Sequence, residues 1–157
     1  MTSKKDINKS VKKAEQICSK VGVKLTAKRK NVLIILLHSG VPLSAYELTD
    51  EYKEHFSESI PTMSIYRMLD FLVQENLAHK LNSSNKYVSC SHIACDHQHE
   101  IPQFLICDVC NSVSEIGVKK EIIKALNQSV KKVGFMLNSQ QLELHGMCEN
   151  CQKERLN

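Results

Sequence analysis

The 157-residue sequence contains no tryptophan and only four tyrosines and four phenylalanines. Large aromatic side chains supply much of the buried area of a protein core, so we expect part of the stability to come from another source. Long apolar runs are missing as well, because the longest one, Val32 to Leu37, is far below the ~18–20 residues that cross a bilayer. No apolar stretch follows the Lys-rich N-terminus, so we expect no signal peptide. The sequence predicts a cytoplasmic protein without a membrane partner.

Composition and charge indicate a folded protein with a basic N-terminal part. Apolar residues make up 42% and charged residues 24%, as in ordinary globular domains, and the length fits one domain or two small ones. Up to Lys30 there are ten Lys or Arg residues against two acidic ones, whereas from Lys86 onward eight basic and eight acidic residues balance. A basic N-terminal face is typical of nucleic-acid binders, although a solvated Lys-rich helix would give the same counts.

Seven cysteines indicate a metal site rather than disulfides, because thiols stay reduced in the cytosol. Four of them form two pairs, Cys107-Asp-Val-Cys110 and Cys148-Glu-Asn-Cys151. Two such pairs are typical of a tetrahedral four-cysteine zinc site. The alternative, a redox-active dithiol, needs a strand before the pair and a helix after it. A polar turn follows the first pair and the second lies near the chain end, so we predict structural zinc.

The first 90 residues have the pattern of four helices followed by a β-hairpin. Apolar periodicity and capping residues predict four helices. The first covers 6–21, the second follows Thr26 and ends at Ser39, the third follows Ser44, and the fourth starts around Pro61. Glu47 stands three residues after Ser44, as in a capping box. Two short runs, 78–81 and 86–90, flank a polar Asn/Ser turn and predict the hairpin. This order is that of a winged helix-turn-helix, whose last helix enters the DNA major groove and whose hairpin is the wing.

The rest of the chain has the pattern of a hinge and a small α/β domain. The predicted elements are a polar hinge at 91–102, strands at 104–106 and 113–116, an amphipathic helix through 122–133 and a strand at 135–145. We therefore predict an α+β protein with a winged-helix domain at 1–90 and an α/β domain at 103–157. A domain of about 60 residues buries little apolar surface, so a zinc staple would supply the missing stability.

A second set of potential metal ligands lies around the predicted hinge, with one carboxylate after the first cysteine pair. Its members are His79, Cys90, His92, Cys95, His97, His99 and Glu115. Imidazole, thiolate and carboxylate ligands from separate segments suit a reversible zinc site, whose occupancy depends on how wing, hinge and C-terminal domain are arranged. Any one histidine here is equally well explained as a solvated surface residue, but so dense a set favours a regulatory site.

Four runs of sequence carry a resemblance to a known family. They are Leu25-Thr26-Ala27-Lys28-Arg29, Ser44-Ala45-Tyr46-Glu47-Leu48, Ile65-Tyr66-Arg67-Met68-Leu69-Asp70-Phe71-Leu72 and Leu144-His145-Gly146-Met147-Cys148-Glu149-Asn150-Cys151. The first three resemble the DNA-binding half of the ferric uptake regulator family. The fourth, together with the first cysteine pair, is similar to its dimerisation half. The likeness covers essentially the whole chain in one order, so 103–157 would be the dimerisation and metal-binding domain of a homodimer.

Within that family the zinc uptake regulator branch is the nearest likeness, since it is similar in having a histidine at the hinge and a cysteine that closes the wing. The resemblance implies a regulatory zinc held by His79, Cys90, His99 and Glu115. Seven residues separate His99 from Cys107, unlike the His-rich run that leads directly into the cysteine pair of iron-sensing members. His97 is therefore the alternative third ligand, and the roles of His92 and Cys95 stay open.

The combined pattern predicts a zinc-responsive DNA-binding repressor, and the resemblance implies control of zinc-uptake genes. Each chain would hold two zinc ions, one structural and one regulatory. Zinc in the regulatory site is expected to fix wing and hinge, so that the homodimer presents both recognition helices to a pseudo-palindromic double-stranded DNA operator.

Candidate DNA-binding residues lie on the predicted helices. Arg67 is expected to read a purine edge, and Tyr46 to stack on a base or touch a thymine methyl group. Arg67 could instead contact a phosphate or pair with Asp70, and Tyr46 could pack in the core. The remaining predicted DNA-binding residues are Tyr66, Thr62 and Lys28.

Two other functional classes fit parts of the pattern. An iron- or peroxide-responsive regulator would share the fold and differ in the second metal site, but an oxidisable thiolate such as Cys90 suits iron sensing in air poorly. A zinc deaminase needs His-x-Glu with Pro-Cys-x-x-Cys, and a metalloprotease needs His-Glu-x-x-His. The sequence lacks the Pro-Cys-x-x-Cys and His-Glu-x-x-His motifs, so we predict neither catalysis nor a small organic substrate.

Overall fold

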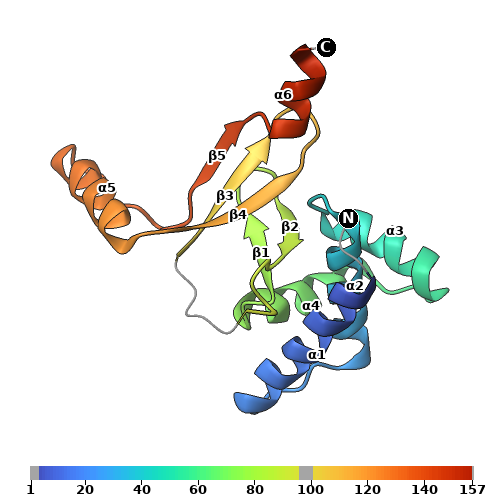
Figure 1. The fold of residues 1–157 in the computed structure, drawn as a ribbon. Helices are drawn as coiled ribbons and strands as arrows, with labels where there is room; N and C mark the ends of the chain where they lie inside the picture. The colour runs from blue at the N-terminus through green and yellow to red at the C-terminus, as the bar shows by residue number, and fades with distance from the viewer. Residues whose placement is uncertain (1–3, 96–100, 157) are drawn as a thin grey trace. The chain divides into compact units, whose positions relative to one another are not determined.

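The computed structural model describes residues 4–95 and 101–156, and the chain divides into two compact units, 1–95 and 96–157 (Figure 1). We call them the N-terminal unit and the C-terminal unit. The division lies inside the predicted hinge of 91–102. The end of that hinge differs from the structure, since Ile101 and Pro102 are the first residues of a strand. In the described ranges, no helix combines the length and the apolar character that crossing a membrane requires.

Four helices build most of the N-terminal unit: α1 (Lys4–Lys20), α2 (Ala27–Ser39), α3 (Ala45–Phe56) and α4 (Thr62–Gln74). The predicted caps are confirmed. Thr26 accepts a hydrogen bond from the backbone N–H of Arg29, and Gly40 ends α2 in the left-handed conformation that glycine adopts without strain. Ser44 and Glu47 form a complete capping box at the start of α3. Local sequence signals therefore set the boundaries of these helices.

One apolar core fills the N-terminal unit. α1 contributes the buried residues Ile7, Val11, Ala14 and Cys18, which recur with the period of a helix. Tyr52 of α3 is fully buried, and its hydroxyl accepts a hydrogen bond from the side chain of Asn31 at 3.0 Å. The same core includes Tyr87 and Cys90, which belong to the wing. The helices and the wing are therefore one packed body.

The predicted wing is confirmed, because β1 (Ala78–Leu81) and β2 (Lys86–Ser89) pair in antiparallel fashion. Two further interactions hold the wing against the start of α3. Tyr87 and Leu43 exchange backbone hydrogen bonds of 2.8 and 3.0 Å. Lys86 Nζ lies 3.0 Å from a carboxylate oxygen of Glu47. A movement of the wing would thus act directly on the helix-turn-helix.

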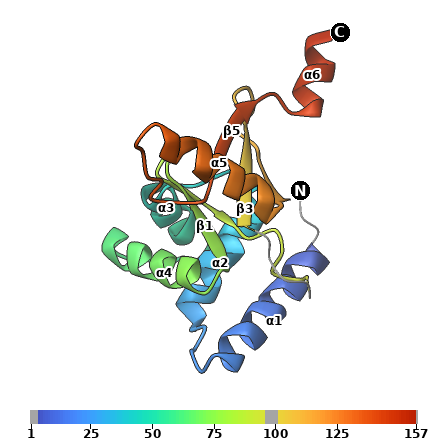
Figure 2. The ribbon, with the colours of Figure 1, turned by 90° about the vertical axis from the view of Figure 1, so that its left-hand side faces the viewer.

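The C-terminal unit contains β3 (Ile101–Cys107), β4 (Val113–Val118), α5 (Lys120–Lys132), β5 (Glu143–Gly146) and α6 (Glu149–Leu156). Its sheet has the order β4-β3-β5, in which β3 is antiparallel to β4 and parallel to β5. Figures 1 and 2 show α6 beyond the end of the sheet at which β3 and β5 finish. The parallel pairing therefore brings the ends of two strands that are distant in sequence to one edge.

Two aspects of the C-terminal unit differ from the sequence prediction. The sequence predicts one strand through 135–145, but β5 covers only Glu143–Gly146, and α6 was not predicted. Gly134, with a φ of 73°, ends α5 and turns the chain. The fully buried side chain of Gln103 then holds the incoming segment, since its amide donates to the carbonyl of Gln140 at 2.9 Å and accepts the backbone N–H of Leu142. Hydrogen bonds from the Gln103 side chain thus hold this segment, where the sequence predicted the backbone pairing of a β-strand.

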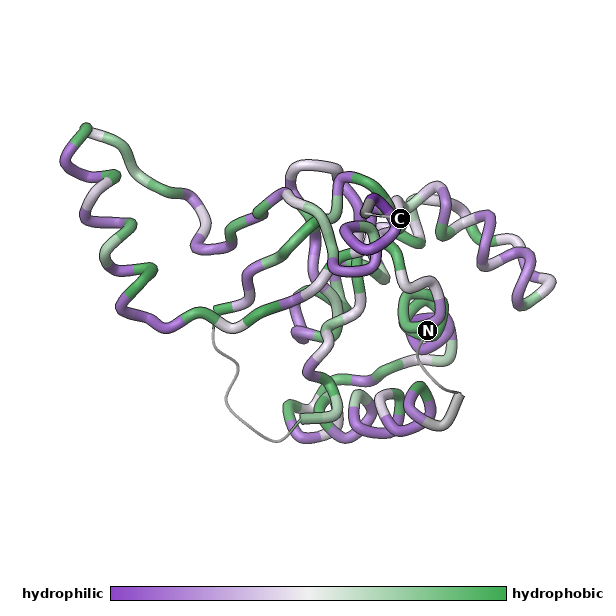
Figure 3. The backbone as a smooth tube through the Cα atoms, turned by 45° about the horizontal axis from the view of Figure 1, so that its top comes forward, coloured by the Kyte–Doolittle hydropathy of each residue, from purple (hydrophilic) through white to green (hydrophobic). Residues whose placement is uncertain are grey.

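The predicted apolar stripe of α5 is buried only in small part. Ile123 is 3% exposed, whereas Ile122 is 57% and Val133 80% exposed. Phe135 and Met136, which follow the helix, are exposed as well. Hydrophobic and hydrophilic residues alternate along this helix, at the left of Figure 3. Within the described part of the chain, this apolar surface remains open to solvent.

Candidate metal centres and nucleic-acid interface

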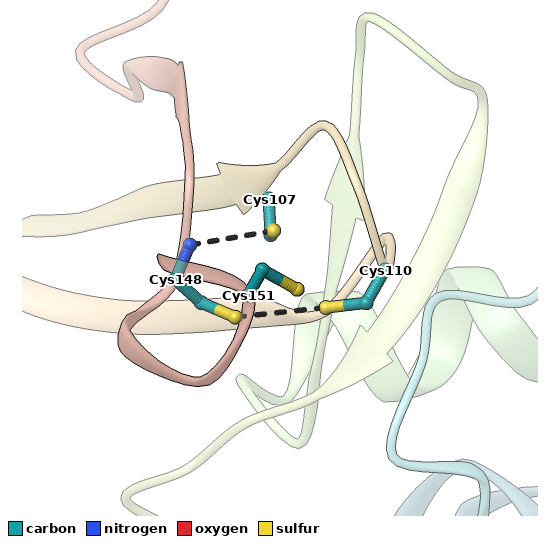
Figure 4. A group of neighbouring side chains, drawn as sticks. All are labelled: Cys107, Cys110, Cys148 and Cys151. Carbon is teal, nitrogen blue, oxygen red and sulfur yellow. Dashed lines mark hydrogen bonds between the residues drawn. The ribbon is translucent and has the colours of Figure 1, made fainter. Parts of the chain in front are cut away.

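The four cysteines of the two Cys-x-x-Cys pairs come together in the C-terminal unit. Cys107 is the last residue of β3 and Cys110 follows in the turn, while Cys148 precedes α6 and Cys151 lies in its first turn. In the parallel ladder Cys107 stands opposite Gly146, which brings the second pair beside the first. Figure 4 shows the four side chains gathered around a common point.

The spacing of the sulfur atoms fits a tetrahedral zinc ion. All four Sγ atoms lie within 4.8 Å of one another, and those of Cys110 and Cys148 are 3.7 Å apart. Four zinc–thiolate bonds of about 2.3 Å, arranged as a tetrahedron, place the sulfurs about 3.8 Å from each other. Cys107 and Cys151 are buried and Cys110 is exposed, so the cluster has a packed side and an open side. The predicted structural ligands are therefore compatible with zinc in number, type and spacing.

Hydrogen bonds in the cluster favour thiolate at Cys107 and Cys110. Backbone N–H groups of Cys110 and Cys148 lower the pKa of Cys107 to about 6, and the Cys148 N–H lies 3.3 Å from Cys107 Sγ. The Ser112 hydroxyl, 3.0 Å from Cys110 Sγ, lowers the pKa of Cys110. A hydrogen bond with the neighbouring Cys148, followed by burial, raises the pKa of Cys151, so its protonated thiol is favoured. A metal cation at the centre would bind the thiolates and release the remaining protons.

The surroundings of the second pair differ from those predicted. It follows β5 and begins α6, so it has the strand–Cys-x-x-Cys–helix arrangement that the sequence did not indicate. This context alone would fit a redox dithiol. The sulfurs of Cys148 and Cys151, however, face those of Cys107 and Cys110, and a dithiol needs only its own two. Four convergent sulfurs favour the metal site.

The structure brings together two of the predicted regulatory ligands. His79 lies in β1 and Cys90 follows β2, and their ligand atoms are within 4.8 Å of each other. The backbone N–H of Cys90 donates to the carbonyl of Leu77 at 3.0 Å, which extends the wing ladder. Val88 stands opposite His79 and two residues before Cys90, so these side chains share one face of the wing. Cys90 and the Nε2 atom of His79 are buried.

The remaining predicted ligands belong to the C-terminal unit, to a turn after the wing, or to residues outside the described ranges. Glu115 is in β4 of the C-terminal unit, where it is partly buried and stands opposite Phe104. His97 and His99 lie outside the described residues. His92 and Cys95 form a turn, in which the N–H of Cys95 donates to the carbonyl of His92 at 3.0 Å. Among the described residues, neither belongs to a group of convergent metal ligands.

The two strongest DNA-reading candidates are on the surface of the helix-turn-helix. Tyr46 of α3 is 68% exposed and so does not pack in the core. Arg67 of α4 is exposed too, and in the described part of the chain it forms no ion pair with Asp70. Tyr66 is partly buried and packs against the core. Tyr46 and Arg67 are thus available to a ligand.

The remaining candidates have partners within the protein. The Thr62 hydroxyl accepts a hydrogen bond from Thr49 at 3.3 Å, and Lys28 Nζ lies 2.5 Å from a carboxylate oxygen of Glu58. Lys28 also borders an open hollow of about 460 Å³ between the start of α2 and α4. Its lining residues are Thr26, Ala27, Lys28, Arg29, Ser64, Arg67 and Met68. Three basic side chains around one hollow suit the negative charge of a phosphate.

One exposed residue of α4 was not anticipated from the sequence. Met63 is 66% exposed, although methionine counted as apolar and not as a binding residue. The helical period could have located it, because Ile65, Leu69 and Leu72 are fully buried and Met63 lies off their stripe.

Comparisons with known proteins agree on one family. The profile of the Ferric uptake regulator family matches residues 20–145. The zinc uptake regulation protein of Escherichia coli is 35% identical over 138 residues, which is 88% of this chain and 78% of that protein. The ferric uptake regulation protein of Helicobacter pylori is 30% identical over 134 residues, 85% of either chain. A solved structure of a zinc uptake regulator complexed with zinc and DNA is similar at a TM-score of 0.81 and 28% identity, over 99% of this chain and 100% of that one.

Proposed function

Because the chain belongs to the ferric uptake regulator family, we propose that it is a zinc-responsive, DNA-binding transcriptional repressor of zinc-uptake genes. It is a regulator and not an enzyme. The observation that carries the proposal is the four-cysteine cluster in a chain that also has a winged helix and whose relatives include a zinc uptake regulation protein. A repressor works where the chromosome is, so we assign it to the cytoplasm.

The chain would hold two zinc ions with different tasks. Cys107, Cys110, Cys148 and Cys151 form the structural site, whose four thiolates suit a tightly held ion. The proposed regulatory ligands are His79, Cys90, His99 (or His97) and Glu115. The closeness of His79 and Cys90 on one face of the wing supports this assignment. Ligands drawn from wing, hinge and β4 would make zinc occupancy depend on the arrangement of these segments.

DNA binding is assigned to the exposed side of α3 and α4. Arg67 would read a base edge, and Tyr46 would contact a base face or methyl group. Lys28 and the hollow beside it would contact phosphates, with Thr62 and Tyr66 holding α4 in place. The basic residues of α1 add attraction that does not depend on DNA sequence.

A homodimer would cover the open apolar surface of the C-terminal unit. This surface includes Ile122, Val133, Phe135, Met136 and Leu144, each about half exposed or more. Exposed apolar surface of this extent on so small a unit is typical of a protein interface. A two-fold dimer would present two recognition helices and would match a pseudo-palindromic operator.

The decisive experiment titrates metals into protein from which weakly held metal has been removed. DNA duplexes selected by the protein from a random-sequence pool serve as probe, and binding is followed by fluorescence anisotropy. Zinc should restore binding at lower free concentration than iron(II) or manganese(II). Restoration by iron(II) but not by zinc would overturn the zinc assignment in favour of an iron-responsive regulator of the same fold.

A further inference from the structure

Met63 is a large apolar side chain held on the outer face of α4, the proposed DNA-reading helix. It is the second residue of α4 and is 66% exposed. Arg67, four residues later, is exposed on the same face, because residues four apart in an α-helix lie one above the other. The opposite face, with Ile65, Leu69 and Leu72, is fully buried. The fold therefore fixes the direction of Met63 without using its side chain for packing.

A hydrogen bond fixes the start of α4 against α3 beside this residue. The hydroxyl of Thr49 donates to that of Thr62 at 3.3 Å. Tyr46 lies three residues before Thr49 in α3, and Met63 directly follows Thr62. Two exposed side chains, Tyr46 of α3 and Met63 of α4, thus belong to the helix segments that this bond joins. Arg67 of α4 is exposed as well.

We propose that Met63 is a base-reading residue that makes an apolar contact with the 5-methyl group of a thymine in the major groove. The proposal rests on the proposed DNA-binding function and adds a second specificity contact to α4. The first residues of a recognition helix are those that reach the base edges. The 5-methyl group of thymine is the apolar group that bases expose in the major groove. A methionine suits this contact because its unbranched thioether adapts its shape to the group it meets.

The spacing along α4 locates the thymine. Four residues of helix rise about 6 Å, and base pairs are stacked about 3.4 Å apart. The methyl group read by Met63 should therefore lie within about two base pairs of the base read by Arg67. Burial of one methyl group corresponds to about a fourfold change in affinity.

The test replaces single thymines of the operator with deoxyuridine, which lacks only the methyl group. The operator is the duplex selected from a random pool by the zinc-loaded wild-type protein. Affinities are measured for the wild type, Met63→Ala and Met63→Leu. Val21→Ala is the matched control, because Val21 is an apolar residue with 60% exposure that follows α1 and is not part of α4. Circular dichroism and zinc content check that each variant is folded and loaded.

We expect one deoxyuridine position per half-site to weaken wild-type binding about fourfold, and Met63→Ala to weaken binding to the unmodified duplex by a similar factor. At that position Met63→Ala should lose nothing further, whereas Met63→Leu and Val21→Ala should keep the wild-type sensitivity. If Met63→Ala retains every deoxyuridine penalty of the wild type, the inference is overturned and the proposed function stands. If the zinc-loaded wild type selects no sequence at all, both are overturned.

Discussion

Lys86 of the wing and Glu47 of α3 form an ion pair in which Nζ and Oε1 are 3.0 Å apart. The other carboxylate oxygen of Glu47 accepts the backbone N–H of Ser44 at 2.7 Å. One side chain thus closes the capping box and holds the wing. The Ser44 N–H, followed by Lys86, lowers the pKa of Glu47 to about 2.

Glu47→Gln should remove a part of the stability that depends on pH. Since the folded-state pKa of Glu47 is lowered, its charge stabilises the protein above the unfolded value of about 4.5, and this contribution is lost as pH falls towards 2. Glutamine keeps the capping box but not the charge, and the pair is half exposed, so we expect a loss below about 1 kcal/mol at pH 7. Urea unfolding from pH 7 to 3 should show wild type and variant converging. Glu51→Gln, also in α3, is the control; a gap that stays constant with pH contradicts the prediction.

Cys107→Ser should disrupt the C-terminal unit and not merely metal sensing. The variant removes one of four thiolates, and one of the two whose pKa is lowered, so it should lose the tightly held zinc and part of its folded structure or dimer. Zinc content after mild chelation and sedimentation velocity measure both effects. Cys95→Ser, outside the cluster, should keep the tightly held ion. A folded Cys107→Ser dimer with full DNA binding would rule out the structural assignment.

Gln103→Leu should loosen the segment that leads into β5. The substitution leaves the carbonyl of Gln140 and the N–H of Leu142 without their side-chain partner, which costs about 1–3 kcal/mol. Because β5 carries the second cysteine pair to the first, zinc should also leave faster for a competing chelator. Stopped-flow transfer of zinc to a chromophoric chelator measures the rate. Gln74→Leu, at an exposed position of α4, is the control, and equal rates for both variants would contradict a positioning role of Gln103.

Arg67→Ala should relax base preference at one position of the operator. A bidentate contact from guanidinium to guanine is worth about 1–3 kcal/mol, and its loss should be confined to that base pair. Competition binding with single-substituted duplexes measures the preference. If Arg67 contacts only a phosphate, the variant should instead bind all sequences more weakly and show a salt slope lower by about one.

Cys90→Ser should weaken the regulatory site and leave the structural one intact. The substitution keeps the size of the side chain and removes the soft thiolate beside His79. The variant should remain a folded dimer, retain the tightly held zinc and need at least about tenfold more zinc to bind DNA, since each 1.4 kcal/mol of lost affinity is tenfold. Anisotropy titrations at buffered zinc concentrations measure the shift. If DNA binding by the variant depends on zinc as in the wild type, Cys90 is a buried thiol of the wing and not a zinc ligand.

The fold of the N-terminal unit could be predicted because its determinants are local. Thr26 and Ser44 cap their helices through bonds within one turn, and the Asn/Ser turn sets the wing. The two Cys-x-x-Cys pairs likewise predicted that their four cysteines converge, because this spacing is typical of a four-cysteine zinc site. The regulatory ligands remain a prediction, with His97 and His99 outside the described residues.

The fold of the C-terminal unit was harder to predict from the sequence, because long-range contacts determine where its helices and strands begin and end. The start of β5 depends on Gln103, which is 39 residues from its partner Leu142 and carries no local sign of being buried. Helix α6 lacks an apolar stripe and is anchored instead through Cys151. Met63 was missed for the opposite reason, since its residue type indicated the core and its position in the helical period indicated the surface.

The packing of the wing into the core of the N-terminal unit affects how zinc binding would change DNA binding. Tyr87 and Cys90 share that core with the helices, so the reading surface moves as one rigid piece. Zinc would then change how often the operators are occupied and leave the preferred base sequence as it is. Genes whose operators match the preferred sequence less well would be repressed only at higher zinc concentrations. The order in which genes are repressed would then depend on their operator sequences alone.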